Sequence, residues 1–203
     1  MVPALALRMQ VDFSIELGRD DPTLEIPWFD PDGRLQYHNL KLAPASLAEI
    51  PEAAEFPELR DFLAQLNAPD SVLESAKCDA WSTMELHPEE EIFGEPWKFA
   101  SYVDLLFSAI SARNSFSHHE NVLQTLTTLL KDAPDGPSAA EFILRRCYSL
   151  RQEELDEGFY FTAYVFGYGA NESQARQHWS AALARVSLAL LRVSRAEPQK
   201  TAL

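Results

Sequence analysis

The clearest pattern of hydrophobic and polar positions in the chain runs from Gly158 to Val193. Apolar residues occupy alternate positions from Phe159 to Val165, and most of the residues between them are tyrosines. Successive side chains of a strand point to opposite faces of a sheet, so this segment predicts a strand with one apolar face and one tyrosine-rich face. Asn171 and Gln174 then fit the start of a capped helix. The apolar stripe of that helix consists of Ala175, Trp179, Ala182, Leu183, Val186, Leu190 and Val193.

Earlier parts of the chain repeat this order of elements with weaker patterns. Helices are predicted after capping boxes that begin at Ser46 and Ser117, and after Pro57. The segment 97–107 fits both a strand and a helix that is apolar all round. We favour the strand, because a neighbouring segment can pair with it in a hairpin. Further strands are predicted over 7–17, 24–28, 35–39, 76–86 and 142–150.

The ends of three predicted helices resemble one another. They read Ala68-Pro69-Asp70, Ala133-Pro134-Asp135 and Ala196-Glu197-Pro198. This similarity indicates a single domain, 1–203, built from three β-β-α units at 4–70, 71–135 and 138–198. Chance is the alternative, because short segments of this kind are common after helices. The predicted fold is a two-layer α+β domain, an antiparallel sheet of about six or seven strands with helices on one face.

The overall charge narrows the classes of partner. The 203 residues carry a formal net charge of −14, and 46% of them are hydrophobic, too many for a disordered chain. Nucleic acid and anionic membrane surfaces require clustered cations, so neither is an expected partner. The two cysteines, Cys78 and Cys147, lie in apolar segments and are expected to be buried free thiols. No run approaches membrane-spanning length, and a cytoplasmic protein without a cofactor is expected.

The sheet face opposite the helices is the candidate binding surface. Aromatic rings with polar tips supply contact area at low entropic cost and are enriched at interfaces. Such a face would bind an unidentified protein or small molecule. Alternatively, its rings could pack beneath a loop or form a homodimer contact. The candidate residues on this face are Asp79, Trp81, Tyr102, Tyr148, Tyr160, Tyr164 and Tyr168.

Two acidic segments, 87–91 and 153–157, are interpreted as solvated hairpin turns that could also bind a cation or a basic partner. His118 and His119 suggest a metal site. Adjacent helical residues point about 100° apart, however, so we expect these histidines to begin a helix instead.

The sequence does not decide whether the protein is an enzyme. It contains no Gly-x-Ser-x-Gly elbow and no phosphate-binding loop with lysine. The first hypothesis is a non-catalytic binding or regulatory module. A small hydrolase or lyase is the second, with His87, Glu85 and Glu89 as acid–base groups. An acidic inhibitor of a cationic protein is the third.

Overall fold

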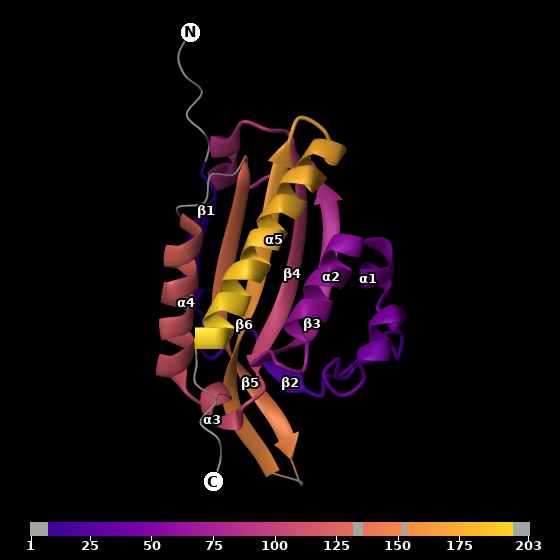
Figure 1. Cartoon of the computed structure of the whole chain (residues 1–203), viewed down its shortest axis with the longest axis vertical. Coiled ribbons are helices and arrows are strands. Elements are labelled where there is room, and N and C mark those ends of the chain that lie inside the picture. The colour runs from indigo at the N-terminus through magenta and orange to yellow at the C-terminus, as the bar shows by residue number, and fades with distance from the viewer. Residues whose placement is uncertain (1–7, 132–135, 152–153, 197–203) are drawn as a thin grey trace.

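A computed structural model describes residues 8–131, 136–151 and 154–196 and shows an α+β fold in two layers (Figure 1). One layer is a mixed six-stranded sheet in the order β1-β5-β6-β4-β3, and β2 also pairs with β5. The strands are β1 (Gln10–Ile15), β2 (Leu24–Ile26), β3 (Leu73–Thr83), β4 (Trp97–Phe107), β5 (Ser138–Arg151) and β6 (Glu154–Gly169).

The other layer is helical and lies on one face of the sheet (Figure 1). It contains α1 (Pro51–Glu55), α2 (Pro57–Leu66), α3 (Ile110–Arg113), α4 (Phe116–Lys131) and α5 (Glu172–Ala196). Two 3₁₀ helices, η1 (Pro44–Glu49) and η2 (Pro88–Phe93), lie in the connections. No helix in the described part of the chain is long and apolar enough to cross a membrane.

The predicted purely antiparallel sheet is wrong at one edge. β1 and β2 both run parallel to β5, along its residues 139–144 and 147–149 respectively. The chain therefore keeps its direction across the polar residues 18–22, so β1 and β2 do not form an antiparallel pair. The segment 35–39 is not a strand. The β3–β4 and β5–β6 pairs are antiparallel hairpins as predicted, while a threefold repeat in the sequence stays a prediction.

The strand interpretation of 97–107 is confirmed. β4 pairs with β3 on one side and with β6 on the other. All but two of its residues are buried, and a strand that is buried on both sides carries apolar residues in both directions. This is why its sequence also resembles a buried helix.

Two predicted helix caps are wrong. The hydroxyl of Ser115, not Ser117, accepts the backbone N–H of His118 at 3.3 Å near the start of α4. The 3₁₀ helix that contains Ser46 has no side-chain cap. Asn171 does cap α5, since its side-chain oxygen accepts the N–H of Gln174 at 3.0 Å.

The main core lies between the helices and the apolar face of the sheet, and it contains the predicted apolar stripe of α5. Trp179 is fully buried there and donates its indole N–H to Ser101 on β4 at 2.8 Å. Gly167 permits the close approach of α5, because a Cβ at this position would lie 2.1 Å from the backbone nitrogen of Trp179. The apolar face of β6 therefore packs on the helix that follows it, as the sequence predicts.

Candidate functional site

The sheet face opposite the helices is covered at one end by β2 and the segment that follows it. Leu24 and Ile26 are buried there with Tyr160, in a second, smaller core. The indole N–H of Trp28 donates to the carbonyl of Ala76 at 2.8 Å and fixes the cover to β3. Tyr160 therefore belongs to a packed layer and is 3% exposed.

The other end of this face is covered by η2. Phe93 stacks on Tyr168 with ring centroids 4.1 Å apart, and the Tyr168 hydroxyl donates to Glu90 at 2.8 Å. Glu90 also receives the Lys98 ammonium at 2.8 Å. Burial opposes ionisation of Glu90, but the hydrogen bonds from Lys98, the His87 N–H and Tyr168 outweigh it and lower its pKa. This end of the face is closed by a fixed ion pair.

Four partly exposed rings form an aromatic row between the two covers. Trp81 on β3 meets Tyr102 on β4 edge-on, with centroids 6.5 Å apart. Tyr102 lies 5.8 Å from Tyr164 on β6, which is parallel to Phe166 at 6.1 Å. All four are half-buried. The row thus crosses three strands and is partly exposed to solvent, although the Lys98 ammonium already lies 5.7 Å from the centroid of the Phe166 ring.

A polar network lies next to the aromatic row. Arg145 on β5 donates to Glu16 at 2.7 Å and to the Thr162 hydroxyl at 3.1 Å. Thr162 in turn donates to Asp104 on β4 at 2.7 Å. Asp104 is 7% exposed, so it is a carboxyl group held inside the sheet face by a neutral donor.

The carboxyl groups of this face have perturbed acidities. Burial raises the pKa of Asp104 to about 6, against the opposing effects of Thr162, Lys77 and Arg145. Burial, together with the charges of Glu16 and Asp12, raises the pKa of Glu141. Burial thus disfavours the negative charge of both groups more than their neighbours stabilise it.

The structure brings together only part of the predicted site. Trp81, Tyr102 and Tyr164 lie side by side in the aromatic row, and Asp79 is exposed next to them on β3. Tyr160 and Tyr168 lie on the same face but beneath the two covers. Tyr148 is different: the alternation of β5 places it on the other side of the sheet, with Phe142 and Leu144.

Several residues of the site were missed by the sequence analysis. Phe166 extends the aromatic row, and Arg145, Glu141 and Thr162 form the polar part of the face. Phe166 continues the alternation Tyr160–Thr162–Tyr164, and Glu141 and Arg145 share the parity of their strand. The sequence therefore already contained the alternation that places these residues on this face. Pairing between β5 and β6 was needed to show that these positions are neighbours.

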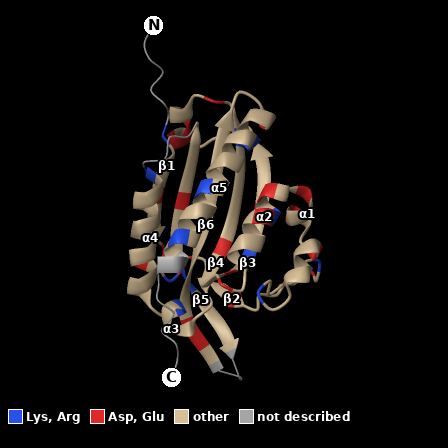
Figure 2. Ribbon diagram, viewed as in Figure 1, with Lys and Arg blue, Asp and Glu red and all other residues tan. Residues whose placement is uncertain are grey.

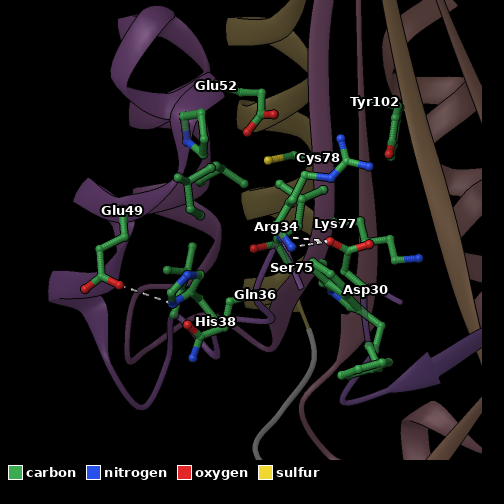
Figure 3. A pocket seen from close by; sticks show the side chains of 18 of the residues that line it. Asp30, Arg34, Gln36, His38, Glu49, Glu52, Ser75, Lys77, Cys78 and Tyr102 are labelled. Atoms are coloured by element: carbon green, nitrogen blue, oxygen red, sulfur yellow. Dashed lines mark hydrogen bonds and ion pairs between the residues drawn. The ribbon is translucent and has the colours of Figure 1, made fainter. Parts of the chain in front are cut away.

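Two hollows lie along β3, at the outer edge of the sheet. The larger, about 530 Å³, is lined by the 28–40 segment, η1, α1 and the residues around Ala76. Figure 3 shows Glu52 and Cys78 on one side of this hollow, with Tyr102 and Lys77 on the other. The smaller, about 440 Å³, lies between Phe56, Trp81 and the start of α5. Burial raises the pKa of the Cys78 thiol to about 12, so Cys78 is not an activated nucleophile.

The other chemical candidates do not converge. His87, Glu85 and Glu89 are exposed and line neither hollow. His119 is buried in the core against Phe107, and burial lowers its pKa to about 4. The described residues contain no group of three or more His, Cys, Asp or Glu that could hold a metal ion.

The two predicted acidic turns differ from one another in the structure. Residues 88–93 form η2, in which Glu90 is held by Lys98 and Tyr168. The second prediction is wrong over its described residues, because 154–157 are not a turn but belong to β6 and pair with 148–151 of β5. Glu153 lies outside the described residues, and exposed Glu157 pairs with Arg146 at 3.4 Å.

Comparison with known proteins assigns no family to this arrangement. No family model, curated protein or solved structure matches the chain.

Proposed function

We propose that this chain is a non-catalytic binding protein whose open sheet face takes up a cationic surface of a partner protein. The observation that carries the proposal is the aromatic row of Trp81, Tyr102, Tyr164 and Phe166, which lies half-exposed between two covers. Rings on neighbouring strands are already fixed, so a partner gains contact area with little loss of side-chain entropy.

The surroundings of the row favour cations. Asp79 flanks it on β3, and Asp104 and Glu141 lie on the adjoining strands with incompletely compensated charge. A lysine or arginine side chain could lie over a ring face while its charge meets Asp79, which is exposed, or Glu141, which is half-buried. The net charge of −14 adds long-range attraction for a basic partner, and an inhibitor of a cationic protein is one form of this function. Free thiols at Cys78 and Cys147 support the cytoplasm as its location.

Affinity capture from the source cells tests this function. The wild type is compared with a Trp81→Ala/Tyr164→Ala double variant, and a Leu188→Ala variant is the matched control, because Leu188 is exposed on α5. We expect at least one captured protein to be lost by the double variant, retained by the control and released as salt is raised. A set of captured proteins that the double variant leaves unchanged would contradict the proposal. Sedimentation of the wild type separates this outcome from a homodimer formed through the same face.

A further inference from the structure

The outer edge of β3 has no strand beside it in the described chain, since β3 pairs with β4 alone. Its backbone orientation is set by hydrogen bonds. The N–H of Ser108 donates to the carbonyl of Val72 at 2.8 Å, so the backbone N–H and carbonyl of Val72 point towards β4. Ser75 lies three positions further along, so its backbone groups point away from β4. Its N–H donates to the side chain of Asn67 at 3.0 Å. A bulge between Ser75 and Cys78 shifts the register.

Beyond the bulge, the backbone groups of Cys78, Ala80 and Ser82 face away from β4. The Ala80 N–H confirms this orientation, because it donates to the side chain of Asp79 at 2.7 Å. The carbonyl of Ala76 already accepts the indole N–H of Trp28. In the described structure, no strand pairs with the outward groups of Cys78 and Ser82. The edge is therefore occupied near the bulge and unpaired with any described strand from Cys78 onwards, where Cys78 and Ser82 are half-buried and Ala80 is 9% exposed.

The open part of this edge adjoins both hollows. Cys78 lines the larger and Ser82 the smaller. Glu52 lines the larger hollow, and Glu55 and Glu172 line the smaller. Figure 2 shows the acidic positions of α1 and α2 beside β3. Basic residues also line them, Arg34 and Lys77 the larger and Arg176 the smaller, but the acidic residues outnumber these cations in each hollow. An extended chain lying along the edge would thus place alternate side chains in two hollows with an excess of acidic residues.

We propose that the outer edge of β3, from Cys78 to Ser82, is a strand-addition site for an extended basic segment of another polypeptide. The Asp79 carboxylate holds the Ala80 N–H while no partner is bound. A lysine of the incoming segment competes for that carboxylate and frees the Ala80 N–H to form a backbone hydrogen bond with the added strand. Backbone hydrogen bonds hold the segment, and the acidic hollows select its basic side chains. The site lies on the outer edge of β3 and shares Asp79 with the open sheet face, but its backbone hydrogen bonds are its own.

The opposite edge of the sheet does not have these features. On β1 the side chain of Asp12 accepts the N–H of Phe13 at 2.8 Å, as Asp79 does on β3. Neither hollow, however, is lined by a residue of β1. Strand addition is therefore expected at β3 and not at β1.

Fluorescence anisotropy with a labelled peptide of about ten alternating valine and lysine residues tests the proposal. Ser82→Pro removes an outward N–H without removing a bond to β4, and we expect it to weaken binding about tenfold or more. Ser82→Ala controls for the hydroxyl, which donates to Glu172 at 2.6 Å. Ile15→Pro places the same change at an outward position of β1 and should leave binding unchanged. Glu52→Gln/Glu55→Gln should weaken binding, most strongly at low salt.

Amide hydrogen exchange of the wild type supplies a readout that needs no variant. Bound peptide should slow exchange at Cys78, Ala80 and Ser82 and leave exchange on β1 unchanged. The proposal is overturned by any of three results: no binding of the peptide, equal binding of a valine–glutamate peptide, or protection that is absent from β3.

Discussion

Thr162 on β6 donates its hydroxyl proton to Asp104 on β4 over 2.7 Å. This bond gives Asp104 a neutral partner in a place where burial disfavours its charge. Arg145 bonds Thr162 from the other side, but its closest carboxylate is Glu16, at 2.7 Å. The sheet face therefore holds a carboxyl group whose charge costs stability, which is common where a protein binds a ligand of opposite charge.

Replacing Asp104 with asparagine should stabilise the protein at neutral pH. Because the folded state raises the pKa of Asp104 to about 6, it binds this proton more tightly than the unfolded chain does. The contribution of Asp104 to the free energy of unfolding is thus most favourable below about pH 4 and falls as pH rises to about 6. We expect Asp104→Asn to gain up to about 3 kcal/mol at pH 8 and little at pH 4. Urea unfolding at both pH values measures this, and an equal effect at both would contradict the assignment.

Alanine at Gly167 should destabilise the fold severely. Its Cβ would meet the backbone of α5, with the carbonyl oxygen of Ala175 at 2.4 Å, and backbone cannot move aside as a side chain can. We expect a loss of at least about 3 kcal/mol in the free energy of unfolding, measured by thermal or urea denaturation. Gly136→Ala is the matched control, because the three atoms nearest to the new methyl group all belong to the His178 side chain, the first at 3.0 Å. Equal losses in the two variants would show that α5 does not lie this close to β6.

Glu90→Ala should loosen the cover formed by η2. The substitution leaves the ammonium of Lys98, whose side chain is 8% exposed, without its carboxylate and removes the acceptor of the Tyr168 hydroxyl. Removing one member of a buried ion pair costs about 3 kcal/mol or more, and urea unfolding measures the loss. Glu89→Ala changes an exposed residue of the same 3₁₀ helix and should have almost no effect. If both variants unfold alike, Glu90 does not hold the cover.

Asp79→Ala should increase self-association, because it frees the Ala80 N–H at an open sheet edge. Asp12→Ala should act similarly through Phe13 on β1. Sedimentation velocity at rising protein concentration measures the effect relative to the wild type. Sedimentation identical to that of the wild type in both variants would show that these aspartates do not protect the edges.

Much of the fold follows from the sequence because its strongest patterns are local. The alternation in β6 and the stripe of α5 each predict both an element and the face that it buries, and both faces lie in the core. The parallel pairing of β1 and β2 with β5 joins residues more than a hundred positions apart, and a turn signal alone does not show whether the chain reverses.

The candidate site was predictable to a similar extent. Alternation alone placed Trp81, Tyr102 and Tyr164 on one face, and the structure brings their rings together. Alternation does not show what covers a face, so the burial of Tyr160 and Tyr168 beneath β2 and η2 was not predictable. Tyr148 was assigned to the wrong face, because apolar and polar residues alternate only weakly along β5.

The most direct test of the central claim is site-specific photo-crosslinking in the source cells. A benzophenone amino acid is placed at Tyr164, in the middle of the aromatic row, and separately at Leu188, on the outer surface of α5. The proposed function predicts a discrete crosslinked partner from Tyr164, lost when Trp81 is also replaced by alanine, and none from Leu188. Crosslinks of equal yield at both positions, or none at Tyr164, would contradict it.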